Sequence, residues 1–108
     1  MLDTNIAIYT IKNRPAKVRE AFRLHQDQLC ISSISWGELV YGAEHSSRPE
    51  QNYRDIEGFS SRLEILPFDN DAASHFGQVR SELYRNGQPI GPYDMEIAGH
   101  ARSLGLIV

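Results

Sequence analysis

Two short apolar runs, each followed by the pattern of an amphipathic helix, constrain the fold of this 108-residue chain more than any other feature. They lie at residues 29–32 and 64–66, and each is only as long as a strand buried in a sheet. Residues 1–2 and 106–108 are also apolar and look like strands cut short. Strands that alternate with helices favour a parallel sheet covered by helices on both faces. We therefore predict an α/β protein with a short parallel sheet.

Local signals predict where the helices begin and end. Asp69 is placed to cap a long helix that ends at Asn86-Gly87. Ser47 and Glu50 have the spacing of a capping box, which predicts a helix start there. Helix-opening prolines and apolar stripes complete the pattern: Pro15 with Val18, Ala21 and Phe22; Trp36, Leu39, Val40 and Ala43; Tyr53, Ile56, Phe59 and Leu63; Ala72, Phe76, Val79 and Leu83; Pro92 with Ile97, Ala98, Ala101 and Leu104.

Composition favours a single globular domain over residues 1–108, with its first strand shortened and its final strand and following segment missing. No apolar run approaches the roughly 20 residues of a membrane span, and no signal peptide precedes the domain, so we expect a cytoplasmic protein. The lone Cys30 lies in an apolar run, which predicts a buried side chain. The net charge of −3 argues weakly against nucleic-acid binding unless a cation neutralises part of the carboxylates.

Three acidic residues stand at the junctions of apolar segments: Asp3, Glu38 and Asp94. Each has a simpler explanation, because Asp3 suits an N-cap, Glu38 a surface position and Asp94 the first turn of a helix. Carboxylates that converge at the carboxyl edge of a sheet would instead repel one another unless a hard cation neutralised them. Oxygen ligands without cysteine or histidine favour Mg²⁺ or Mn²⁺, and such an ion supports phosphodiester hydrolysis.

The whole chain resembles the VapC-type toxins of the PIN-domain family, with the matching segments in the same order. An isolated Asp-Thr-Asn is weak evidence, whereas several segments at family-like spacing are strong evidence. The segments are Met1-Leu2-Asp3-Thr4-Asn5, Ser35-Trp36-Gly37-Glu38-Leu39 with Tyr41-Gly42-Ala43, Pro89-Ile90-Gly91-Pro92-Tyr93-Asp94, and Ile97-Ala98-Gly99-His100-Ala101.

This resemblance implies a three-layer α/β/α sandwich and a Mg²⁺- or Mn²⁺-dependent endoribonuclease. It also implies a homodimer, a cognate VapB-type antitoxin, and cleavage of tRNA or another structured RNA to inhibit translation. Asp3, Glu38 and Asp94 match the acidic metal positions of the family, and Asn5 matches a polar neighbour that orients Asp3 or a bound water. Glu96 departs from the pattern, and we expect it to point away from the site because it lies only two residues from Asp94.

Two alternatives differ in class from a ribonuclease. The first is a catalytically incomplete form that keeps antitoxin binding and dimerisation, since relatives continue past the last helix into a further strand and a polar segment. The second is a phosphotransfer enzyme, but the haloacid-dehalogenase type needs Asp-x-Asp where this chain has Asp3-Thr4-Asn5. Among the histidines, His100 favours a packed or interface position over a general base. The others, His25, His45 and His75, lack metal-ligand spacing.

Overall fold

The computed structural model describes residues 1–13, 20, 23–24, 28–88 and 90–108, so the helix predicted from Pro15 to Phe22 lies outside the described residues. None of the described helices is long and apolar enough to cross a membrane. In chain order the elements are α1 (Thr4–Asn13), β1 (Cys30–Ser32), α3 (Ser33–Glu44), α4 (Pro49–Ser60), β2 (Glu64–Leu66), α5 (Asn70–Arg85) and α6 (Pro92–Ser103).

The two strands form a parallel sheet, as predicted. Ile31 of β1 lies opposite Ile65 of β2. On the other side of β1, Leu2 forms an isolated parallel bridge with Ile31, and its amide donates to the Cys30 carbonyl at 2.8 Å. Three parallel segments therefore end at one edge of the sheet, and the α/β class is confirmed.

The apolar end of the chain differs from the prediction. Residues 106–108 form no strand, and Ile107 is 87% exposed. One contact does align them with the sheet, because the Met1 ammonium donates to the Ile107 carbonyl at 2.5 Å. A single hydrogen bond is too little to define strand pairing.

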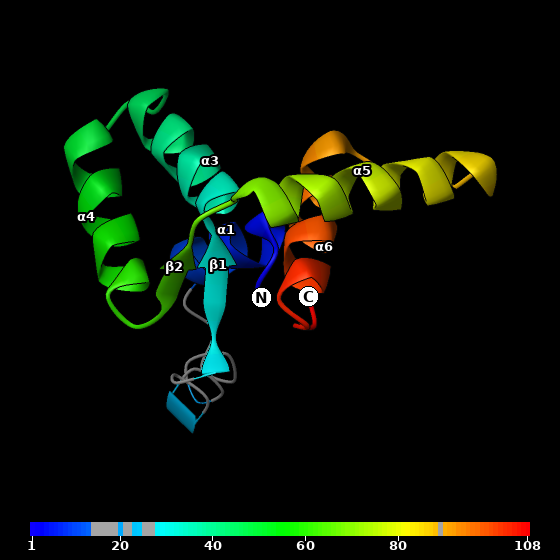
Figure 1. Cartoon of the computed structure of the whole chain (residues 1–108). Helices are drawn as coiled ribbons and strands as arrows, with labels where there is room; N and C mark the ends of the chain where they lie inside the picture. Colours follow the sequence, from blue (N-terminus) through cyan, green and yellow to red (C-terminus); the bar gives the residue numbers. More distant parts are fainter. Residues whose placement is uncertain (14–19, 21–22, 25–27, 89) are drawn as a thin grey trace.

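The strands lie between two groups of helices, with α3 and α4 on one side and α5 and α6 on the other (Figure 1). One buried cluster joins Ile31 to Leu39, Ala43 and Ile56, so the predicted stripes of α3 and α4 face the sheet. The second cluster contains Met1, Cys30, Ile97 and Ala101, and Leu66 packs against it. Burial of Cys30 confirms its predicted structural role.

Helix ends agree with the sequence in most places. Asp69 caps α5 by accepting a hydrogen bond from the Ala72 amide at 2.9 Å, and Gly87 after α5 has a positive φ of 67°. The predicted capping box at Ser47 is wrong, because α4 begins one residue later, with Arg48 as N-cap and no side-chain cap. Pro49 explains this start, since its fixed φ and missing N–H suit the first helical position.

The last helix also departs from prediction at its end. The apolar stripe predicts that Leu104 faces inward, but its side chain is 47% exposed. Leu104 is the C-cap of α6, where the backbone has left helical geometry, so the helical spacing no longer sets its direction.

Helices α5 and α6 pack closely where α6 carries a glycine. A Cβ built on Gly99 would lie 2.5 Å from both the amide nitrogen and the Cα of Phe76. Backbone atoms cannot move aside as the end of a flexible side chain can. Only glycine therefore permits this approach of the two helices.

Replacing Gly99 with alanine tests this contact. We expect Gly99→Ala to lower the free energy of unfolding by about 2 kcal/mol or more, because the added methyl overpacks a backbone contact. Urea unfolding followed by circular dichroism measures the change. Gly77→Ala is the matched control in α5, where nothing lies within 4 Å of the new Cβ, and it should stabilise the protein by about 0.5–1 kcal/mol. Equal stability of the two variants would contradict the proposed role of Gly99.

Candidate active site

Asp3 lies at the junction between the first parallel segment and α1. Its Oδ1 accepts a hydrogen bond from the Ile6 amide at 2.8 Å, so Asp3 caps the helix. This bond uses one carboxylate oxygen, and the half-buried side chain keeps the other for a further partner. The capping role and the predicted ligand role are therefore compatible.

Glu38 of α3 is joined to α1 by a buried pair of hydroxyls. Thr4 Oγ1 lies 2.9 Å from Glu38 Oε1 and 2.8 Å from Ser35 Oγ, and both hydroxyl residues are buried. A hydroxyl has one proton to donate, so Thr4 donates to the carboxylate while Ser35 can donate to Thr4. This arrangement fixes Glu38 beside the start of α1, and therefore beside Asp3.

Glu96 of α6 is the residue that departs from the family pattern, and its exclusion from the ligand set stays a prediction. It is half-buried, and the pKa of its carboxyl is raised, first by desolvation and then by the negative charge of Glu38. Residues two apart on a helix do point in different directions, so Glu96 and Asp94 diverge. Helix α3 packs against α6, and the negative charge of Glu38 therefore reaches Glu96.

Asp94 and Asn5 are the exposed members of the predicted set. Asp94 lies in the first turn of α6, where its negative charge interacts favourably with the helix dipole. Its Oδ2 lies 3.6 Å from the position that a Cβ built on Gly91 would take. Asn5 lies in the first turn of α1. Its side-chain amide was expected to orient Asp3, but it is not the hydrogen-bond partner of the Asp3 carboxylate. That partner is the backbone amide of Ile6.

Asp3 and Glu38 lie near each other through Thr4, but the predicted ligands form no ready-made metal site. Thr4, next to Asp3 in the chain, donates to Glu38, and the negative charge of Glu38 raises the pKa of Glu96, two residues after Asp94. Within the described residues, no three Asp, Glu, His or Cys side chains are placed so that they could hold a metal ion. The assignment of Asp3, Glu38 and Asp94 as ligands stays a prediction.

The donor chemistry nevertheless fits a hard divalent cation. All the candidate side chains offer oxygen, which Mg²⁺ and Mn²⁺ prefer. No ion pair between described residues neutralises Asp3, Glu38, Asp94 or Glu96. The pKa of Glu96 is raised first by burial and then by the negative charge of Glu38, which has no ion-pair partner among the described residues. A cation is the simplest group to compensate it.

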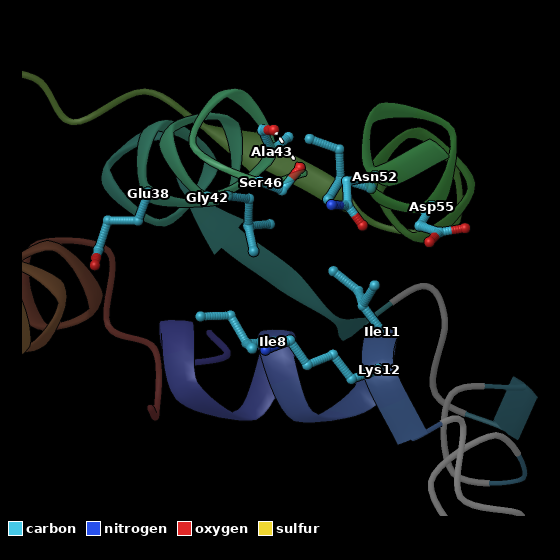
Figure 2. A pocket seen from close by; sticks show the side chains of 11 residues that line it. Ile8, Ile11, Lys12, Glu38, Gly42, Ala43, Ser46, Asn52 and Asp55 are labelled. Atoms are coloured by element: carbon cyan, nitrogen blue, oxygen red, sulfur yellow. Dashed lines mark hydrogen bonds between the residues drawn. The ribbon is translucent and has the colours of Figure 1, made fainter. Parts of the chain in front are cut away.

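A groove of about 570 Å³ adjoins the acidic residues, between α1, α3 and α4 (Figure 2). Its apolar lining includes Ile8, Ile11, Leu39 and Ile56. Glu38 stands at one end of the groove, nearest α6 (Figure 2). The groove therefore combines an apolar floor with a carboxylate at its end.

His100 is a packed residue, as predicted. It is 1% exposed, and Phe68 contacts its ring edge-on with the centroids 5.5 Å apart. Its Nδ1 lies 2.8 Å from Ser32 Oγ. Burial lowers the pKa of His100 and outweighs Asp69 and the Pro67 backbone, which act to raise it. The imidazole is therefore neutral near pH 7.

Sequence reasoning missed the residues that position the carboxylates. Thr4 stood within the recognised Asp3-Thr4-Asn5 segment, but nothing in the sequence shows that its hydroxyl reaches Glu38. Glu96 did carry a signal, since a charged residue in an otherwise apolar helix face needs a reason. The sequence does not show that α3 packs against α6, which is what sets the surroundings of Glu96.

Comparison with known proteins places the chain in a family. The PIN domain model matches residues 1–108. The chain is 60% identical to the tRNA(fMet)-specific endonuclease VapC of Shigella flexneri over 108 residues, covering 100% of this chain and 82% of that protein. It is 50% identical over 108 residues to Ribonuclease VapC2 of Haemophilus influenzae, with the same coverage.

Solved structures agree with this relationship. The DNA-bound VapBC of Salmonella typhimurium contains a chain that is 58% identical, with a TM-score of 0.97 and coverage of 100% of this chain and 82% of that one. VapBC2 of Rickettsia felis, bound to a promoter DNA fragment, matches with 37% identity and a TM-score of 0.93 over 98% of this chain and 81% of that one. The fold, the position of the acidic segments and these relatives together show that the chain belongs to the PIN-domain family, as a VapC-type member.

Proposed function

We propose that this protein is the toxin of a toxin–antitoxin pair, an endoribonuclease that hydrolyses phosphodiester bonds of tRNA with the help of Mg²⁺ or Mn²⁺. The observation that carries the proposal is that Thr4, the neighbour of Asp3, donates to Glu38 beside the edge of the parallel sheet, while no ion pair among the described residues neutralises either carboxylate. The relatives support the choice of RNA as substrate, because they are named as ribonucleases and one of them as specific for tRNA(fMet).

Asp3, Glu38 and Asp94 are the residues that would hold the ion. A bound Mg²⁺ or Mn²⁺ supplies Lewis-acid stabilisation of the negative charge on the phosphate under attack. Thr4 keeps Glu38 in one orientation by donating to its Oε1. Asn5 presents an exposed amide one residue after Thr4, where it can orient water or a phosphate oxygen.

The first prediction from this proposal concerns Asp3. Asparagine caps helices as well as aspartate does, so Asp3→Asn should keep α1 while it removes the charge. We expect cleavage of bulk tRNA to fall by a factor on the order of a hundred or more, the rate equivalent of several kcal/mol. Gel analysis of the fragments, with Mn²⁺ and with chelator, measures the effect.

A matched control separates charge loss at the site from charge loss elsewhere. Asp71→Asn makes the same change at an exposed aspartate in the first turn of α5, and it should cleave like the wild type. Fragments that persist in chelator or in Asp3→Asn would refute the proposed role. If the wild type cleaves nothing while it still binds an antitoxin, the catalytically incomplete alternative is correct.

We further propose that a VapB-type antitoxin binds in the groove between α1, α3 and α4. Two relatives were solved as VapBC complexes, which supports a VapB partner. The apolar floor at Ile11 and Ile56 suits an apolar segment of such a partner. The carboxylate of Glu38 at the end of the groove suits a basic side chain, which would also block the site.

The groove offers a glycine at which this binding can be tested. Gly42 lines the groove, is exposed, and has nothing within 4 Å of the position that an added Cβ would take. We therefore expect Gly42→Trp to fold normally but to weaken antitoxin binding at least about tenfold, because the indole fills the groove. Isothermal titration with the cognate antitoxin measures the affinity. Gly58→Trp, exposed on α4 outside the groove, should bind as the wild type does, and equal affinity of both variants would rule the groove out.

A further inference from the structure

Two exposed aromatic rings are stacked on the face of α3 that carries Glu38. The ring centroids of Tyr41 and His45 lie 5.1 Å apart, with an angle of 19° between the ring planes. Tyr41 is 65% exposed, and His45, the C-cap of α3, is exposed as well. The two residues follow Glu38 by three and seven positions, so all three side chains lie along one face of the helix. The aromatic pair therefore begins one helical turn from the candidate active site.

Glycine at position 37 leaves one face of the Tyr41 ring open. Aromatic side chains on a helix point toward its N-terminus and lie over the preceding turn. His45 accordingly covers one face of the Tyr41 ring, while the opposite face lies toward Gly37, four residues earlier. Gly37 is exposed, and beyond its chain neighbours and its own helix backbone no atom of the described residues lies within 4 Å of the position that a Cβ would take. A flat ring can therefore stack on the open face of Tyr41, beside Glu38.

The surroundings of the pair favour a nucleobase over a protein side chain as the partner. A protein interface surrounds an aromatic anchor with contacts that exclude water, whereas a base needs only the flat face of a ring. The other exposed residues of α3 are Gly37, Gly42 and Glu44, and none of them offers an apolar side chain. The ring of Tyr41 thus presents a stacking surface without the apolar rim that a protein partner would use.

The charge of the chain also favours a contact that does not depend on phosphate. Phosphate contacts supply much of the affinity of most nucleic-acid-binding proteins. Here 11 Lys and Arg stand against 14 Asp and Glu, and the carboxylates of Asp3 and Glu38 repel a phosphate unless a cation is bound. Stacking of a base on an aromatic ring adds affinity without charge, and it tolerates any base.

We propose that a base of the RNA substrate stacks on the open face of Tyr41 and thereby places an adjacent phosphate beside Glu38. Tyr41 is then a substrate-binding residue, and His45 supports its ring from the other side. This inference rests on the proposed function for its choice of RNA. It adds to that function a side chain that contacts the base instead of the phosphate.

Binding of a fluorescein-labelled, single-stranded RNA of mixed sequence tests the stacking contact. Fluorescence anisotropy in Mg²⁺ measures the affinity, and every variant also carries Asp3→Asn, which slows cleavage during the measurement. Tyr41→Ala removes the ring and should weaken binding about tenfold, whereas Tyr41→Phe keeps the ring and should bind within about twofold of the Asp3→Asn parent. Tyr84→Ala removes an exposed tyrosine of α5 and should bind as the parent does. An oligomer of the same length without bases should bind the parent and Tyr41→Ala equally.

A second variant covers the open face of the ring and leaves Tyr41 in place. Gly37→Leu puts an apolar side chain one turn before Tyr41, so it should weaken RNA binding by roughly the same factor of ten. It should also raise the melting temperature, because glycine is a poor helix former and leucine pairs with an aromatic residue four positions later. Loss of binding can then not be ascribed to unfolding. Gly58→Leu, at an exposed glycine of α4, is the matched control and should raise the melting temperature without weakening RNA binding.

The outcomes separate this inference from the proposed function. RNA binding by Tyr41→Ala and Gly37→Leu as tight as that of the parent would overturn the inference, and so would a parent that binds no RNA or an equal loss with the oligomer that lacks bases. If the two variants weaken antitoxin binding and leave RNA binding unchanged, the face belongs to a protein partner and the inference is equally overturned. A wild type that cleaves no RNA would refute the proposed nuclease, while RNA binding that depends on Tyr41 would still support the stacking contact.

Discussion

The ending of parallel segments at one edge of a small sheet is the constraint on which the site depends. Parallel strands that end at the same edge of a sheet bring the residues that follow them together, and here those residues include Asp3 and helix α3, which carries Glu38. Burial raises the pKa of Glu96, and the negative charge of Glu38 raises it further. The surrounding fold holds these carboxylates in place.

Hydrogen bonds of hydroxyl groups and close contacts between helices keep the carboxylates in place. Thr4 at the start of α1 donates a hydrogen bond to Glu38, and Ser32 at the start of α3 is hydrogen-bonded to His100. Among the described residues, no buried side-chain nitrogen or oxygen lacks a hydrogen-bond partner. The absence of a side chain on Gly99 lets α6 approach the backbone of α5. Together these contacts position a charged site at the edge of a sheet in which the described part of the chain forms two full strands.

Much of the fold could be predicted because it follows from local signals. The apolar runs at β1 and β2, the cap at Asp69 and the glycine at position 87 each depend on neighbouring residues alone. The errors occurred where two signals competed. At the start of α4 the proline prevailed over the capping box at Ser47, and after α6 the chain left the helix before Leu104.

The candidate site was only partly predictable. The carboxylates of Asp3, Glu38 and Asp94 stand out in the sequence because they interrupt apolar segments and match a family pattern. Their partners do not stand out, since Thr4 and His100 act through contacts between residues far apart in the chain. Helical spacing places Glu96 correctly relative to Asp94, but it carries no information that α3 lies beside it.

The most direct test of the central claim is the anomalous diffraction signal of Mn²⁺ in crystals of this protein soaked with the ion. A metal site at the acidic edge predicts a peak bounded by the carboxylates of Asp3, Glu38 and Asp94, and no such peak in crystals of Asp3→Asn. A peak elsewhere on the molecule, or none at this edge of the sheet at millimolar Mn²⁺, would contradict it.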